Sequence, residues 1–86
     1  MSHGRDFTSD EAIRIGEQIG VDWSRHELEQ FRMGLAVELE HGARDPETNV
    51  TDDDLLLTGK IAWAHLKGIP DYYTRLLAME EEAERQ

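Results

Sequence analysis

Three side chains in this 86-residue sequence combine residue types and spacing that could bind a metal ion. Glu38 and His41 stand three positions apart in the segment ELEH, which places both side chains on one face of a helix. His65, within a later apolar segment, could supply another ligand. Carboxylate-bridged di-metal bundles take a Glu-x-x-His motif from each of two helices and further glutamates from two others. This chain has the motif once, so Glu80 or Asp71 would have to add an oxygen, or a homodimer would have to double it.

A purely structural interpretation of the same residues stays open. His41 lies near the end of its predicted helix, where the helix dipole stabilises a cationic side chain without a metal. His65 has apolar neighbours, so we expect its ring inside the bundle and in contact with a carboxylate or hydroxyl, Glu38 being the best candidate. If His41 joins that pair, tetrahedral ligation would suit zinc and open six-coordination would suit iron or manganese. Without His41 the pair is structural.

A second stretch, DPETNVTDDDLL over residues 45–56, carries side-chain oxygens at alternate positions. An EF-hand calcium loop also needs a glycine at its sixth position and a bidentate glutamate at its twelfth. Val50 and Leu56 occupy these two positions. We therefore interpret residues 43–52 as an acidic connector between helices.

The sequence offers little for catalysis. It has no cysteine, no glycine-rich phosphate loop, and three serines of which two stand at predicted helix starts. Thiol chemistry and disulfides are therefore excluded. We predict no catalytic residue and no bound cofactor, and we favour a protein that is not an enzyme.

Four helical segments would have to position these side chains. Apolar residues recur at helical spacing in each segment, and a capping residue or a proline marks each start. The helices are predicted near residues 8–20, 24–42, 52–67 and 70–84. No strand pattern appears, so we predict an all-α fold: a compact four-helix bundle forming a single domain over residues 1–86, with flexible ends at 1–6 and 84–86.

The start of each helix can be predicted individually. Thr8 and Glu11 predict a capping box for the first helix. Ser24 is the predicted N-cap of the second helix, and Thr51 or Asp52 that of the third.

The apolar patterns also predict how the helices pack. The third helix is apolar nearly all round, so it is predicted to be the most buried. On the fourth helix Tyr73 is predicted to be half-exposed, and the core-facing residues are Tyr72, Leu76, Met79 and Ala83. Glycines within helices predict close contacts between helices, because each costs about 1 kcal/mol relative to alanine. These glycines are Gly16, Gly34 and Gly59.

The charge balance restricts the partners. With 19 acidic and 9 basic residues the formal net charge is −10, which repels phosphate backbones and anionic membrane surfaces. The N-terminal sequence MSHGRDFTSDEA has no apolar run, and no stretch approaches the ~18 apolar residues that span a bilayer. We expect a cytoplasmic protein that binds neither nucleic acid nor membranes. Its partner is expected to be a protein or a second copy, bound through surface residues such as Met33, Val37, Leu57 and Ala64.

The segments ELEHG, TGKIAWAHL and PDYYTRL resemble a family of short bacterial and phage proteins catalogued only as a domain of unknown function. The resemblance covers about residues 26–80. It implies a small helical domain and assigns neither an activity nor a catalytic residue. The leading hypothesis is therefore a non-enzymatic interaction or accessory module, and the alternative is a metal-binding helical protein that uses Glu38, His41 and His65.

Overall fold

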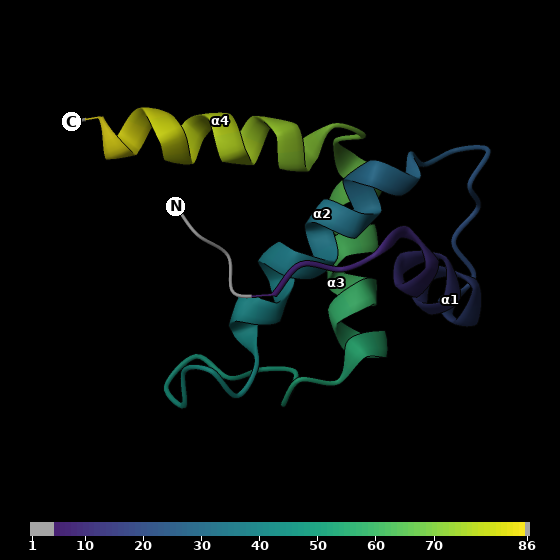
Figure 1. The fold of residues 1–86 in the computed structure, drawn as a ribbon, viewed down its shortest axis with the longest axis horizontal. Helices are drawn as coiled ribbons and strands as arrows, with labels where there is room; N and C mark the ends of the chain where they lie inside the picture. Colours follow the sequence, from purple (N-terminus) through teal and green to yellow (C-terminus); the bar gives the residue numbers. More distant parts are fainter. Residues whose placement is uncertain (1–4, 86) are drawn as a thin grey trace.

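The computed structural model describes residues 5–85, which form four α-helices and one short 3-10 helix (Figure 1). The helices are α1 (Ser9–Ile19), α2 (Leu28–Glu38), the 3-10 helix η1 (Leu39–His41), α3 (Leu55–Gly68) and α4 (Tyr72–Glu84). No residue between 5 and 85 lies in a strand, so the all-α prediction is confirmed. None of the helices in this range is long and apolar enough to cross a bilayer. The flexibility predicted for the chain ends stays a prediction, since residues 1–4 and 86 lie outside the described range.

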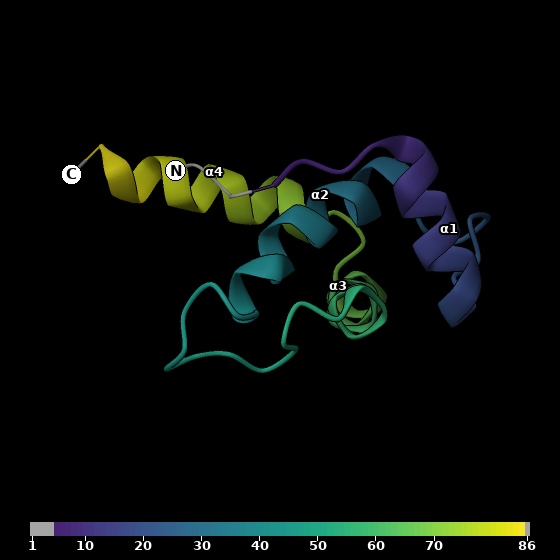
Figure 2. The same ribbon diagram turned by 60° about the horizontal axis from the view of Figure 1, so that its bottom comes forward.

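The first three helices pack around one apolar core, and α4 joins them through its N-terminal end. In Figures 1 and 2 the C-terminal half of α4 extends beyond α2 and α3, on the side away from α1. The core is built from the buried apolar side chains Phe7, Ala12, Ile15, Val21, Phe31, Leu35, Val37, Ala62, Leu66 and Tyr73.

The most deeply buried helix is α2, so the prediction that the third helix would be the most buried was wrong. The reason is position, because α2 packs closely against α1, α3 and α4. Although α3 is more apolar, its Leu56 and Leu57 are exposed. Of the surface predicted for a partner, Leu57 and Ala64 are indeed exposed, whereas Val37 is buried and Met33 is half-buried.

The capping box predicted for α1 is present. Thr8 Oγ1 accepts a hydrogen bond from the Glu11 amide at 3.1 Å, and Glu11 Oε1 accepts one from the Thr8 amide at 2.9 Å. The helix ends at Gly20, whose φ of 94° lies in the left-handed region that glycine tolerates. Both ends of α1 therefore follow from local sequence.

The N-caps predicted for α2 and α3 were wrong, because in each case a nearby aspartate accepts the local hydrogen bonds. Asp22 Oδ1 accepts hydrogen bonds from the Ser24 amide at 2.9 Å and the Ser24 hydroxyl at 2.6 Å, so α2 begins only at Leu28. For α3 the N-cap is Asp54, which accepts from the amides of Leu56 and Leu57 at 2.9 and 3.0 Å.

The caps predicted for α3 are displaced by backbone conformation. Asp52 and Asp53 have φ values of 51° and 63°, which places both in the left-handed region outside the helix. The predicted start near residue 52 therefore moves to Leu55, and the predicted start near residue 70 moves to Tyr72.

The glycines inside the helices do mark close contacts. A β-carbon on Gly34 of α2 would overlap the ring of Tyr73 in α4, and it would lie 3.0 Å from the β-carbon of Ala62 in α3. Gly16 meets the ring of Trp23 in the same way, and Gly59 meets Ile15. The absence of a side chain at Gly34 is what lets α4 approach α2.

Candidate functional site

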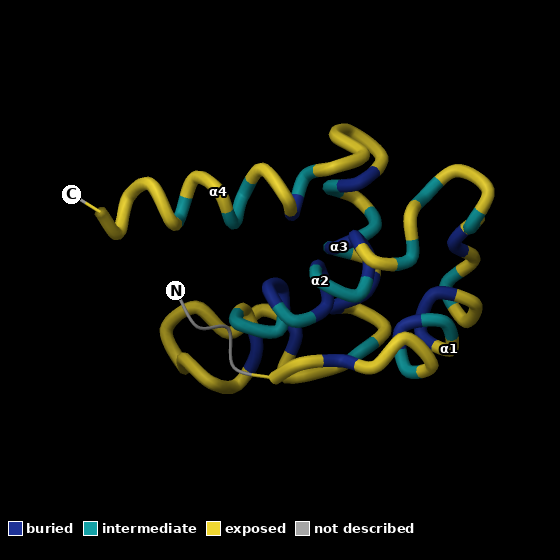
Figure 3. The backbone as a smooth tube through the Cα atoms, turned by 45° about the horizontal axis from the view of Figure 1, so that its top comes forward, coloured by how far each residue is buried: buried dark blue, intermediate teal, exposed yellow. Residues whose placement is uncertain are grey.

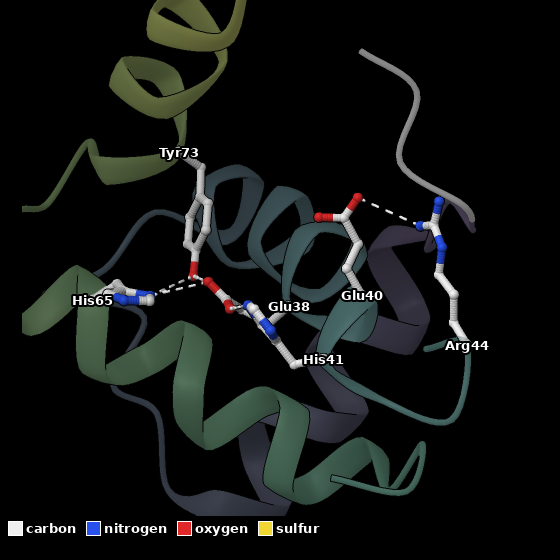
Figure 4. Close-up of polar contacts among 6 residues, drawn as sticks. All are labelled: Glu38, Glu40, His41, Arg44, His65 and Tyr73. Atoms are coloured by element: carbon white, nitrogen blue, oxygen red, sulfur yellow. Dashed lines mark hydrogen bonds and ion pairs between the residues drawn. The ribbon is translucent and has the colours of Figure 1, made fainter. Parts of the chain in front are cut away.

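The carboxylate of Glu38, at the end of α2, is buried with 3% of the residue exposed. Its Oε2 accepts a hydrogen bond from the Tyr73 hydroxyl at 2.7 Å and lies 3.0 Å from His65 Nδ1. His65 Nδ1 also lies 3.1 Å from the Tyr73 oxygen. We call Glu38, His65 and Tyr73 the polar cluster. Figure 4 shows these side chains converging from α2, α3 and α4, and the predicted contact between Glu38 and His65 is confirmed.

The hydrogen-bond pattern of the polar cluster indicates where the protons reside. The Tyr73 hydroxyl donates to Glu38, so its oxygen is left to act as an acceptor. His65 Nδ1 faces this oxygen and the carboxylate, and because both can accept, hydrogen-bond complementarity assigns the donor role to Nδ1. Burial raises the pKa of the Tyr73 hydroxyl, and its hydrogen bond to Glu38 acts in the same direction. Tyr73 therefore remains a protonated donor at neutral pH.

His65 lies at the rim of the bundle, so the expectation that it would lie inside was wrong. Its side chain is 38% exposed, although one face of the ring stacks on Tyr72 at a centroid distance of 4.3 Å and an interplanar angle of 4°. The ring sits where α3 meets the beginning of α4, and Tyr72 covers one of its faces. One edge of the imidazole therefore contacts buried groups and one face is covered by Tyr72, while the remaining surface is exposed.

His41 approaches Glu38 from the other side. Its Nε2 lies 3.5 Å from Oε1, and its side chain is 51% exposed. The three predicted metal ligands are thus neighbours, but His41 and His65 face different oxygens of Glu38. Among residues 5–85 no group of three or more histidine, aspartate or glutamate side chains is arranged to hold a metal ion. The proposed extra ligand Asp71 pairs with Arg75 at 2.7 Å instead.

Sequence reasoning missed Tyr73, because it assigned Tyr72 to the core and left Tyr73 half-exposed. In the structure Tyr73 is fully buried and Tyr72 is half-buried. Two residues of α2 select this orientation. Gly34 leaves room for the ring, and Gln30 Oε1 accepts a hydrogen bond from the Tyr73 amide at 3.1 Å. The sequence did carry one sign of this packing, because a glycine inside a helix, here Gly34 of α2, leaves room for a large ring from a neighbouring helix.

The start of α4 is held by a side chain from another helix. Asp71 occupies the N-cap position but makes no side-chain capping hydrogen bond. Gln30 takes this role, since it accepts from the amide of Tyr73 and donates to Thr74 Oγ1 at 2.6 Å. Together with the polar cluster, Gln30 anchors the first turn of α4 to α2.

The oxygens of the acidic connector bind its own backbone. Asp45 Oδ1 accepts from the Glu47 amide at 3.0 Å, and Asn49 Oδ1 accepts from the Asp52 amide at 2.8 Å. Asp53 Oδ1 accepts from the Ala43 amide at 2.9 Å. These hydrogen bonds shape turns, so the interpretation of this stretch as a connector is confirmed.

A pocket of about 270 Å³ lies beside the end of α2 and the connector. Its charged groups already pair within the chain. Arg44 lies 3.4 Å from Glu40 (Figure 4), and Arg5 pairs with Glu11. The pocket is lined by Arg5, Ala36, Leu39, Glu40, Arg44 and Asp53. Because these charged groups already have partners, the polar cluster is the better candidate for a functional role.

Comparison with known proteins identifies the family of this chain. Searches of curated proteins and of solved structures return no match. Residues 12–82, which extend from α1 to the last turns of α4, match a family described as protein of unknown function (DUF5661). The resemblance seen in the sequence is confirmed by this match. The chain belongs to the DUF5661 family.

Proposed function

We propose that this protein is a small non-enzymatic interaction module that binds another protein through α4. The observation that carries the proposal is the apolar surface of this helix. Most of α4 is coloured as exposed in Figure 3. Tyr73 is the buried residue of α4, whereas Met79 is 61% exposed and Ile69, just before the helix, is 44% exposed. Between them lies a groove of about 190 Å³, lined by Ile69, Tyr72, Arg75, Leu76 and Met79. Exposed apolar surface with a polar margin is typical of protein interfaces.

The polar cluster supports the same proposal as an anchor. Tyr73 stays protonated and Glu38 is engaged by its hydroxyl, so both groups are used in holding α4 to the core. Gln30 fixes the first turn as well. An anchored first turn presents the rest of α4 at a defined angle, which lowers the entropy that binding would cost.

A photocrosslinking experiment in the cells that make the protein tests this role. A photoreactive amino acid at position 79 should yield a covalent adduct with another polypeptide. The same group at position 18, an exposed site on α1, is the matched control and should yield none. Equal labelling at the two positions, or no adduct at position 79, would contradict an interface on α4.

The alternative function, metal binding, is supported by a different observation. The nitrogens of His65 and His41 lie 3.0 and 3.5 Å from the two oxygens of one buried carboxylate. Ligands held about 2.1 Å from one ion stand roughly 3.0–3.4 Å apart in octahedral or tetrahedral geometry, which the pair of His65 and Glu38 matches. Because His41 faces the other oxygen of Glu38, its side chain would have to move for all three residues to bind one ion. Zinc, iron or manganese would be the candidates, according to the geometry adopted. An ion would compete with Tyr73 for Glu38, and for this reason we place metal binding second.

Metal binding can be tested on the purified, untagged protein. Elemental analysis should find a stoichiometric ion, and a chelator should lower the melting temperature. A metal-free protein whose melting temperature is unchanged by the chelator would exclude this alternative.

A further inference from the structure

We infer that the partner of α4 is a second copy of this chain, bound as an antiparallel pair of α4 helices. This inference rests on the proposed interaction role of α4 and names its partner. It starts from a partial mismatch, because the stripe predicted as the core face of the fourth helix packs against the core at Tyr72 and Leu76 and is exposed at Met79 and Ala83.

This stripe has the spacing of a two-helix seam. Its members follow at intervals of four, three and four residues, the a/d pattern of a coiled coil. Tyr73, which contacts the core, lies about 100° around the helix from Tyr72. A partner can therefore cover Met79, Ala83 and the exposed parts of Tyr72 and Leu76 while Tyr73 stays in place. The seam residues are Tyr72, Leu76, Met79 and Ala83.

Charge on one flank of the seam favours a second copy. Arg75 and Glu82 are seven residues apart, so they lie on the same flank, on the side of the seam opposite Tyr73. A two-fold axis between Leu76 and Met79 would place Leu76 of each copy against Met79 of the other. The same axis brings Arg75 of each copy next to Glu82 of the other copy, so two ion pairs form.

The present partners of these two charges do not prevent the exchange. Arg75 lies 2.7 Å from Asp71 and Glu82 lies 3.6 Å from Arg85, and all four side chains are largely exposed. Ion pairs of this exposed kind contribute about 0–1 kcal/mol, so replacing them with contacts across the seam costs little.

The antiparallel direction is favoured over the parallel one. A parallel pair would bring the acidic segment 80–84 of both copies together. An antiparallel pair places this segment near the N-terminal end of the other α4, where the helix dipole is positive. Because α4 extends beyond α2 and α3 (Figures 1 and 2), the two cores would lie at opposite ends of the pair.

Sedimentation equilibrium with charge-reversed variants tests the inference. Wild type should show a monomer–dimer equilibrium, and the concentration series should reach about 1 mM because a contact between two short helices is small. Arg75→Glu and Glu82→Arg should each weaken dimerisation by about tenfold or more, since each places like charges across the seam. An equimolar mixture of the two variants should dimerise, because opposite charges then meet at both contacts.

Matched controls carry the same charge changes on α1. Arg14→Glu and Glu17→Arg alter the net charge equally at exposed sites away from the seam, and should leave the dissociation constant unchanged. Circular dichroism of all four variants verifies that they remain helical. Met79→Glu, in the middle of the seam, should abolish the dimer.

Three results would overturn the inference. The first is a wild-type monomer at every concentration. The second is a Glu82→Arg variant that dimerises like wild type, which would indicate a different pairing direction. The third is a mixture that fails to restore dimers. The crosslink at position 79 separates this inference from the interaction role, since an adduct with a different protein would keep the role and exclude the second copy.

Discussion

At the scale of single residues, the hydroxyl of Tyr73 donates the shorter of two contacts to the buried carboxylate of Glu38. Replacing it in Tyr73→Phe keeps the ring beside Gly34 and removes the 2.7 Å hydrogen bond to Glu38. Because a buried acceptor then loses a donor, we expect the free energy of unfolding to fall by about 1–3 kcal/mol. Urea denaturation measures this change.

Tyr72→Phe is the control for that substitution. Tyr72 stacks on His65 through its ring, which phenylalanine retains, so we expect a change within about 0.5 kcal/mol. Equal stabilities for the two variants would mean that the polar cluster contributes little to holding α4.

At the scale of helices, the approach of α4 to α2 depends on Gly34. A methyl group in Gly34→Ala would overlap the Tyr73 ring and approach Ala62 of α3. Alanine gains about 1 kcal/mol in helix propensity, but overpacking typically costs about 1–3 kcal/mol, so we expect a net loss of stability. Gly68→Ala in α3 is the matched control, because nothing lies within 4 Å of its β-carbon position. Chemical denaturation should rank Gly68→Ala above wild type and Gly34→Ala below it; the reverse order would contradict the close contact.

The start of α1 predicts a dependence of stability on pH. The hydrogen bond from the Thr8 amide lowers the pKa of Glu11, so its carboxylate stabilises the folded state above the unfolded pKa of about 4.3. This contribution is lost as the pH falls through the lower pKa of the folded state. Glu11→Gln keeps a capping acceptor but does not titrate. We therefore expect the melting-temperature advantage of wild type over Glu11→Gln to shrink between about pH 6 and pH 3.

Glu17→Gln is the control for the capping box, since Glu17 is exposed on the same helix and takes no part in the box. Its difference from wild type should vary less with pH. A difference between wild type and Glu11→Gln that stays constant across this range would show that the capping carboxylate does not carry the effect.

At the scale of the whole molecule, net charge opposes folding. With a formal charge of −10 in 86 residues, the compact state brings like charges together. Salt screens this repulsion, and the exposed ion pairs that salt also weakens contribute little. We expect the melting temperature at pH 7 to rise when NaCl is increased from about 20 to about 500 mM, measured by circular dichroism. A fall would indicate that attractive pairs dominate, and near pH 4.5, where the carboxylates begin to protonate, the rise should be smaller.

Parts of this fold could be predicted because the interactions that form them span only a few residues. The number of helices, the capping box of Thr8 and Glu11, and the stop at Gly20 all depend on near neighbours in the chain. The errors in helix starts arose where two local interactions compete. Ser24 could cap a helix, but its amide and hydroxyl donate to Asp22 instead. Which of the two interactions forms depends on backbone geometry that residue types do not reveal.

The candidate site divides in the same way. The sequence alone was enough to bring Glu38 and His65 together, because both stand at the edges of apolar stripes on helices that had to pack. It could not decide between Tyr72 and Tyr73, which differ by about 100° of rotation around α4. Gln30 and Gly34, some 40 residues away, make that choice by binding the Tyr73 amide and leaving room for its ring. Local patterns determine where helices form, whereas the rotation of each helix, and with it the face left exposed, is decided only when distant side chains compete for the same core.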